Sequence, residues 1–373
     1  MTSTPARFPA RTPARIPARI PARTPARTPA RIPARTAEQD QFAASLHDLL
    51  GPGGPEAARR WAAGDHSRGL VLWRELAGLG ATGLAVPPRW GGLGASPMDV
   101  VVACEELGHH ALPGPAAESL AAVPVLLAAL GDDASCERWL PALASGEMVA
   151  TLAVPPRLPL AVDADVAGLA VLAGRDAVFE SAPGIRQRSV DGGRWLFELS
   201  PGRELVRGPA AARARSRALE IGTLASAAQL LGAGQALLEQ TVRHARQRVQ
   251  FGRPVGAFQA VQHRLADVAI GLEFARPMLY AAAIGLGSCE PTEARDVPAA
   301  RDVSAAKVAC ADAAHRAARA ALQVHGAIGY THELDLGLWL AKVRALLPAW
   351  GTQAEHRALV LEALVADSES ACS

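Results

Sequence analysis

The spacing of apolar residues after residue 221 constrains the fold more than any other feature of this chain. Two long runs repeat at intervals of three and four, and their members are Leu224, Ala227, Leu231, Gly234, Leu238 and Val242, then Phe258, Val261, Leu265, Val268, Leu272, Ala275 and Leu279. This is the period of an amphipathic helix, and Pro277 is expected to kink the second. Further helices are expected from about 299 to 324 and then to about 365. Four helices joined by modest loops predict an antiparallel bundle over residues 219–373.

The residues before this bundle divide into two further regions. Residues 37–148 are patterned as helices, and the clearest one starts with Ser96 as N-cap, Pro97 in the first turn and Asp99 beside the helix dipole. Residues 149–218 hold short apolar or alternating segments between Gly, Pro and Asp, which predicts a small, abbreviated β domain. The stretch RGPAAARARSRALEIG has no clear period and is interpreted as a linker. The expected fold is therefore mainly α with a central β domain.

The first 36 residues repeat Pro-Ala-Arg and are expected to form an extended, mobile tail, dispensable or an arm for an anionic partner. The net charge of +2 gives no reason to expect nucleic acid as a partner. No uninterrupted apolar stretch is long enough for a membrane span, so we expect a cytoplasmic protein. The five cysteines have unrelated spacings and are interpreted as reduced core residues.

The stretch RQRVQFGRPVGAFQAVQHRLAD, residues 246–267, places cationic side chains on both sides of a break between two helices. Arg246, Arg248 and Arg253 surround Phe251-Gly252, beside the N-terminus of the next helix. Unpaired backbone N–H groups at such a terminus favour an anion, so a diphosphate could bind there. Arginines at a helix end can also serve only the helix dipole and solubility, and this pattern alone leaves both readings open.

A second unusual stretch is QVHGAIGYTHE, residues 323–333. Gly326 and Gly329 permit close backbone approach, which would admit a ligand or another subunit, or they belong to an ordinary turn between helices. The ten histidines contain no HExxH or comparable spacing, so no metal site is expected. His109, His110 and His356 are interpreted as surface or capping residues.

Taken together, these segments resemble the acyl-CoA dehydrogenase family over about residues 40–373. GATGLAVPPRWGGLGASPMDVVVACEELG is similar to the family's N-terminal helical segment, and the two stretches above are similar to its C-terminal motifs. The resemblance implies helical, β and helical domains, an acyl-CoA substrate, an electron acceptor, and an oligomer with FAD bound between homologous subunits. It also implies FAD-contacting roles for Arg248, Phe251, Gln259, Gln323, Gly326 and Thr352.

The catalytic base of that family is missing where the resemblance would place it. The usual base is a glutamate before a Gly-Thr pair, and the residue before Gly351-Thr352 is Trp350, whose indole has no basic lone pair. A second position used by some members falls on Gly222. Glu220 or Glu355 could substitute, although each is expected to face solvent. The family's Thr-Glu-Pro and Trp-Ile-Thr segments, which cover the flavin ring, are absent from the β domain.

Three functions are compatible with these features, and the catalytic residue is therefore left unknown. The first is a dehydrogenase with a relocated base, and the second is the non-catalytic subunit of a heteromeric acyl-CoA dehydrogenase. The third is a flavin-dependent monooxygenase on the same scaffold. We favour the second, because the base and the flavin-covering segments both depart from the family's pattern. The acyl group, the partner subunit and the electron acceptor are not specified by the sequence.

Overall fold

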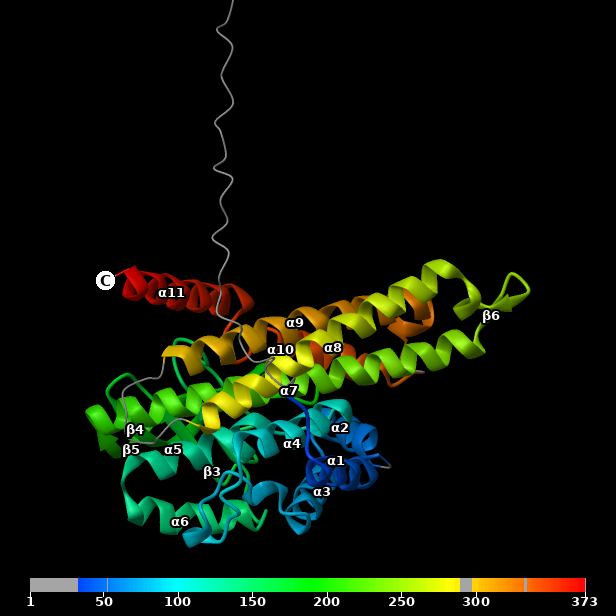
Figure 1. Ribbon diagram of the computed structural model, residues 1–373. Helices are drawn as coiled ribbons and strands as arrows, with labels where there is room; N and C mark the ends of the chain where they lie inside the picture. The colour runs from blue at the N-terminus through cyan, green and yellow to red at the C-terminus, as the bar shows by residue number, and fades with distance from the viewer. Residues whose placement is uncertain (1–32, 52, 289–296, 332–333, 373) are drawn as a thin grey trace, which may run out of the picture. The chain divides into compact units, whose positions relative to one another are not determined.

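The computed structural model describes residues 33–51, 53–288, 297–331 and 334–372. It confirms the expected order of a helical region, a small β-sheet and a second helical region (Figure 1). Residues 1–32 of the predicted tail lie outside the described residues. Arg35 and Thr36, which the sequence places in that tail, are held by the fold. Arg35 donates to Glu105 and Tyr280, and Thr36 is the N-cap of the first helix.

The N-terminal region consists of short helices whose termini are marked in the sequence. Ser96 forms a reciprocal capping box with Asp99, as expected from the local sequence. Two further helices end just before Gly131 and Gly146, which both have positive φ. The helices are α1 (Ala37–Leu50), α2 (Gly54–Ala62), α3 (Ser67–Gly78), α4 (Pro97–His109), α5 (Val123–Leu130) and α6 (Asp133–Ala144), with short 3-10 turns η1 (Ala81–Gly83) and η2 (Pro88–Trp90) and the π-helical turn η3 (Glu118–Ala122).

The central region is a five-stranded sheet in the order β1-β3-β4-β5-β2. Its strands are β1 (Ala150–Ala153), β2 (Ala161–Val162), β3 (Leu169–Ala173), β4 (Ala177–Arg188) and β5 (Trp195–Arg207). β1 and β3 pair in parallel, with Ala150 opposite Leu169, whereas the other pairs are antiparallel. The register of the long β4–β5 hairpin shifts at three places, which is the signature of β-bulges.

The C-terminal region is built on α7 (Pro209–Gln247), which lies between α8 and α9 on one side and the N-terminal helices on the other (Figure 1). The expected linker is wrong, because its residues form the first turns of α7. The other elements are β6 (Val249–Gln250), β7 (Arg253–Pro254), η4 (Val255–Ala257), α8 (Gln259–Gly287), α9 (Val297–His325), η5 (Gly326–Tyr330), α10 (Leu336–Leu346) and α11 (Gln353–Cys372). The predicted last helix is therefore two helices, and α8 continues through Pro277.

Glycines bring α7 against α4 and so join the two helical regions. A Cβ atom on Gly232 would lie 1.8 Å from the backbone oxygen of Glu105, and one on Gly108 would lie 2.1 Å from that of Gln229. No side chain fits between the helix backbones at these points, so glycine is required. The resulting core is continuous and includes Cys104, Cys136 and Cys310, as expected for reduced core cysteines.

Two helices of the described chain, α7 and α8, are long and apolar enough to cross a membrane by length and composition. The apolar window of α7 is 89% buried in the protein core. The window of α8 is 39% buried, and one of its faces is exposed. Because core helices of soluble proteins have the same composition, these two helices are weak evidence for a membrane span.

Candidate functional site

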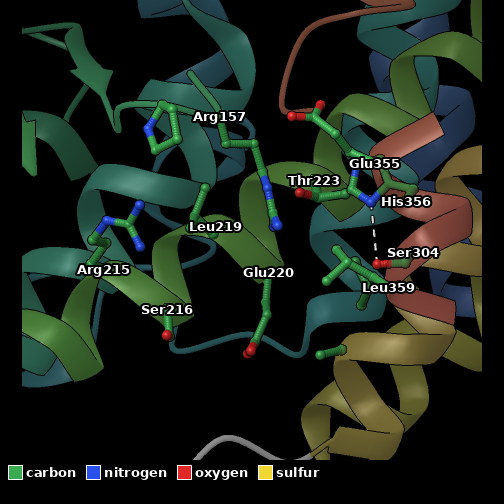
Figure 2. A pocket seen from close by; sticks show the side chains of 13 residues that line it. Arg157, Arg215, Ser216, Leu219, Glu220, Thr223, Ser304, Glu355, His356 and Leu359 are labelled. Carbon is green, nitrogen blue, oxygen red and sulfur yellow. Dashed lines mark hydrogen bonds between the residues drawn. The ribbon is translucent and has the colours of Figure 1, made fainter. Parts of the chain in front are cut away.

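A cavity of about 220 Å³ opens between α7, α9, α11 and the connection that follows β1. Figure 2 draws Arg157 reaching into the cavity, with Thr223 and His356 on one side and Arg215 and Ser216 on the other. A backbone bridge between Val154 and Leu158 closes the loop that carries Arg157. The cavity lies beside one of the two expected base positions, because its lining includes Thr223, the neighbour of Gly222.

Trp350 lies next to this cavity, because its carbonyl oxygen contacts Thr223 and His356, which line it. Its φ of 64° and the φ of 109° at Gly351 end the helical path between α10 and α11 and turn the indole inward. The side chain is 1% exposed and lies against Gly222, where an added Cβ would be 2.3 Å from the ring. The Trp350 carbonyl oxygen is 3.1 Å from Nε2 of His356 and accepts from Thr223 at 3.5 Å. The family's two base positions are thus in contact, and neither carries a carboxylate.

The carboxylate nearest the Trp350 indole is Glu118, in η3 of the N-terminal region. Burial raises the pKa of Glu118, and the charges of Arg194 and a hydrogen bond from the Trp350 side chain act in the opposite direction. Glu118 is 3% exposed, and its Oε1 atom has no hydrogen-bond partner. It lies in the protein core and is closed to solvent, so it is poorly placed to meet a substrate.

Glu355, one of the two substitute bases considered from the sequence, is exposed and caps α11. Its Oε2 atom accepts from the Thr352 backbone N–H at 2.6 Å and from the Thr352 hydroxyl at 2.8 Å. The Glu355 N–H donates back to the Thr352 hydroxyl at 3.3 Å, which completes a capping box. These hydrogen bonds lower the pKa of Glu355. The Glu355 carboxylate is therefore held by hydrogen bonds and is a weak base. Glu220, the other candidate, is partly exposed and lines the cavity.

His356 is not the surface residue expected from the sequence. It is 1% exposed, with Nδ1 3.2 Å from the Ser304 hydroxyl and Nε2 on the Trp350 carbonyl. Burial and the nearby charge of Lys307 lower its pKa to about 4, so the ring is neutral near pH 7. His356 thus fixes the backbone turn at Trp350.

The break between α7 and α8 is a short hairpin with an exposed, cationic and aromatic surface. Phe251 is 91% exposed and Val249 is 55% exposed. Arg246, Arg248 and Arg253 form no ion pair with any residue that the structure describes. The Arg253 guanidinium lies 4.1 Å from the centre of the Phe258 ring. Gln259, also exposed, begins α8 directly after this hairpin.

The end of α9 lies beside the same hairpin. The rings of His244 and His325 stack 4.2 Å apart and join the last turns of α7 and α9. Gln323 lines a groove with Ala260 and His263 of α8. Gly326, with a φ of 65°, turns the chain into η5. Five of the six residues that the resemblance assigns to FAD are therefore gathered at this end of the bundle, which we call the cationic corner (residues 246–259 and 323–326).

Thr352, the sixth, lies elsewhere. Trp350 contacts Gly222, and 25 residues of α7 separate Gly222 from the end of the helix at Gln247. At a rise of 1.5 Å per residue this separation is about 38 Å, which is further than one flavin dinucleotide can reach. The cationic corner and the cavity of one chain therefore cannot hold the same cofactor molecule.

The two regions differ in how well they fit FAD. The cationic corner offers three unpaired guanidinium groups, which suit a diphosphate, and exposed aromatic and amide side chains. The cavity of about 220 Å³ is smaller than the roughly 300–1,000 Å³ typical of ligand sites. A Cβ on Gly351 would lie 3.2 Å from the Arg157 side chain, so the space above Gly351 is filled. The flavin ring does not fit the cavity of this chain.

Sequence reasoning missed Arg157 and the packing of Trp350 on Gly222. Arg157 lies outside any motif, and its only local signal is the Pro-Pro-Arg stretch to which it belongs. Trp350 and Gly222 were each identified as base positions, but their contact joins α7 to the α10–α11 turn. Such a contact between distant segments is not encoded in local spacing.

Comparison with known proteins gives consistent matches over most of the chain. Family models described as the N-terminal and C-terminal domains of acyl-CoA dehydrogenase match residues 36–147 and 212–365. The acyl-CoA dehydrogenase IpdE2 of Mycobacterium tuberculosis is 30% identical over 295 residues, covering 78% of this chain and 85% of the relative.

Solved structures show the same fold at lower identity. Butyryl-CoA dehydrogenase from Megasphaera elsdenii superimposes with a TM-score of 0.73 at 23% identity, covering 89% of this chain and 99% of that one. The ChsE4-ChsE5 complex from Mycobacterium tuberculosis gives a TM-score of 0.74 at 24% identity, covering 89% and 98%.

Proposed function

Because this chain belongs to the acyl-CoA dehydrogenase family, we propose that it is the non-catalytic subunit of a heteromeric acyl-CoA dehydrogenase. In this proposal the chain lends its cationic corner to an FAD site completed by a homologous partner. The assembly removes two hydrogens from an acyl-CoA thioester in the cytoplasm and passes electrons to a separate acceptor. The observation that carries the proposal is the Trp350 ring seated on Gly222.

The chemistry of the reaction explains why this contact matters. A base must take the α-proton of the thioester, and bound FAD supplies the acceptor for the hydride that leaves the β-carbon. The indole of Trp350 can donate a hydrogen bond but has no lone pair to accept that proton. Its ring also fills the space over Gly222, so a carboxylate cannot be accommodated there. The chain therefore lacks both the base and the room for an acyl group at this position.

The exposed surfaces of the chain support assembly with another subunit. Phe251 projects from the hairpin, and the uncovered face of α8 carries Ile270, Phe274 and Met278, which are 53%, 73% and 43% exposed. Large apolar side chains at such exposure favour burial against a partner. The fold neighbour described above as the ChsE4-ChsE5 complex contains two different chains, which supports a heteromeric arrangement.

A self-sufficient dehydrogenase with a relocated base is the second candidate, and the position of Glu220 favours it. This carboxylate lines the cavity on α7, one helical turn before Thr223. Figure 2 draws the Glu220 side chain pointing away from Arg157. A substrate would have to enter a cavity of about 220 Å³ to use Glu220 as base.

Purification with and without a co-expressed homologous subunit separates the two candidates. We expect the chain alone to lack flavin absorbance, and the co-expressed complex to be yellow and to bleach on addition of acyl-CoA. In the complex, Glu220→Gln is expected to leave the rate of flavin reduction unchanged. A chain that binds FAD alone and is reduced by acyl-CoA, with loss of that activity in Glu220→Gln, would establish the second candidate.

The role of the cationic corner is tested in the same complex. A charge-assisted hydrogen bond to phosphate contributes about 1.5–3 kcal/mol, so Arg248→Ala should weaken FAD binding by roughly 10- to 100-fold. Arg74→Ala, at an exposed arginine of α3 remote from the corner, is the matched control. Flavin retention is measured by dialysis and absorbance. Equal flavin retention in both variants would show that the cationic corner does not bind FAD.

A further inference from the structure

A cluster of three histidines and a glutamate lies on the face where α1 and α4 end. Ring nitrogens of His47, His109 and His110 and a carboxylate oxygen of Glu106 all lie within 4.8 Å of one another. Nδ1 of His47 is 3.1 Å from Glu106 Oε2 and 3.1 Å from His110 Nε2. This cluster is separate from the cavity and from the cationic corner. It is not explained by the proposed function.

The environment of each ring favours a cation at the centre of the cluster. His47, Glu106 and His109 all lie in the last turns of their helices, and His110 is the C-cap of α4. The C-terminal ends of two helices therefore face the cluster, and each carries partial negative charge.

His109 provides the most specific observation. Its Nε2 atom lies 3.0 Å from a carboxylate oxygen of Glu239 on α7, whereas its Nδ1 atom is buried with no hydrogen-bond partner among the residues that the structure describes. A carboxylate on one ring nitrogen commonly orients the other nitrogen toward a metal ion. Because Glu239 engages Nε2, Nδ1 is the nitrogen left for a ligand.

We propose that His47, Glu106, His109 and His110 bind one divalent transition-metal ion, with zinc the best match to these ligands. Imidazole and carboxylate groups in a set of four suit tetrahedral zinc, whose bonds of about 2.0–2.1 Å place neighbouring ligand atoms roughly 3.4 Å apart. The widest pair, at 4.8 Å, must therefore close by about 1.4 Å. His47 is half exposed, so its side chain can make this movement and ions can enter.

The site links elements that are distant in the sequence. His47 on α1 lies 59 residues before Glu106 on α4, and Glu239 on α7 lies 130 residues after His109. A bound ion would therefore connect the N-terminal region to the bundle and stabilise the folded chain. Motif spacing finds only Glu106-x-x-His109, which explains why the sequence predicts no metal site.

Metal binding to the full chain tests this proposal. The EDTA-treated protein is titrated with ZnCl₂ in competition with a chromophoric chelator, and one equivalent of zinc with a rise in melting temperature is expected. His47→Ala removes an exposed ligand without disturbing the core and should weaken binding about 100-fold or more, whereas Glu239→Gln should weaken it by about 10- to 100-fold. His263→Ala, at an exposed histidine of α8, is the matched control.

Each outcome decides the proposal. Loss of binding in His47→Ala and Glu239→Gln with retention in His263→Ala supports it. Substitution of Co²⁺ for zinc should also give the visible bands of a tetrahedral complex, and these should vanish in His47→Ala. A chain that binds no zinc, or that binds it equally well in His47→Ala and His263→Ala, would overturn the site and leave a hydrogen-bonded cluster of histidines.

Discussion

The contact between Trp350 and Gly222 can be tested by a change of one methyl group. A Cβ on Gly222 would lie 2.3 Å from two atoms of the Trp350 ring and 2.7 Å from a third. The ring is 1% exposed, so it cannot move aside freely, and overpacking of this kind costs about 1–3 kcal/mol. Alanine in a helix interior would otherwise gain about 1 kcal/mol over glycine. We therefore expect Gly222→Ala to lower the free energy of unfolding by up to about 2 kcal/mol.

The sign of this effect should reverse when the ring is removed. Trp350→Ala alone is expected to cost about 3–5 kcal/mol, because it empties a fully buried site. In that background the new methyl group meets open space, and Gly222→Ala should stabilise the protein by about 1 kcal/mol. The two substitutions are then coupled by about 1–3 kcal/mol, which is the range seen for residues in direct contact.

Urea denaturation of the wild type, both single variants and the double variant measures this coupling. The matched control is Gly271→Ala in the interior of α8, where the added methyl group would approach only the flexible Arg316 side chain at 3.9 Å. It should stabilise the protein by about the same amount with or without the Trp350 ring. An effect of Gly222→Ala that is equal in the two backgrounds would refute the packing of Trp350 on Gly222.

Three further predictions concern buried and capping groups. Burial lowers the pKa of Lys307 to about 7 from an ordinary 10.5, so between these values the unfolded chain binds a proton that the folded chain lacks. The unfolding free energy should thus rise with pH in this window by up to about 1.4 kcal/mol per unit, and urea denaturation at several pH values should show a flatter profile for Lys307→Met. Glu105 is buried between Arg35 and Arg276, so Glu105→Gln should cost about 3–5 kcal/mol in chemical denaturation. Thr352→Ala removes the capping box of α11 and should cost about 1 kcal/mol in the same assay.

Local patterning predicted the helical and β regions because each depends on the period of apolar side chains. It failed for residues 209–220, which form the first turns of α7. The buried face of this segment consists of Ala211, Ala214 and Ala218, which have helical spacing but are small and stand among arginines. Alanine gives little hydrophobic contrast, so the period was not recognised.

The turn between α10 and α11 has local signals, but its geometry depends on tertiary packing. Pro348, Gly351 and the Thr352-x-x-Glu355 pattern mark a helix break, whereas they do not predict the positive φ of Trp350. The left-handed conformation costs about 1–2 kcal/mol for a residue with a side chain, and packing of the indole in the core compensates for it. The candidate site was likewise predicted only in part from local sequence. Motifs located the cationic corner, but only the fold shows that Thr352 is remote from it.

The distance between the cationic corner and the cavity also predicts a cofactor stoichiometry. Since the two regions of one chain are about 38 Å apart along α7, an FAD bound as proposed would lie between the corner of one chain and the cavity of another. In a pair of identical chains the Trp350 ring would occupy the base position in both. In a pair with a catalytic homologue, the partner's cavity joined to this chain's corner remains complete. We therefore expect one FAD per heteromeric pair, measured by flavin absorbance against protein concentration. Two FAD molecules per pair would show that Trp350 does not exclude the flavin ring.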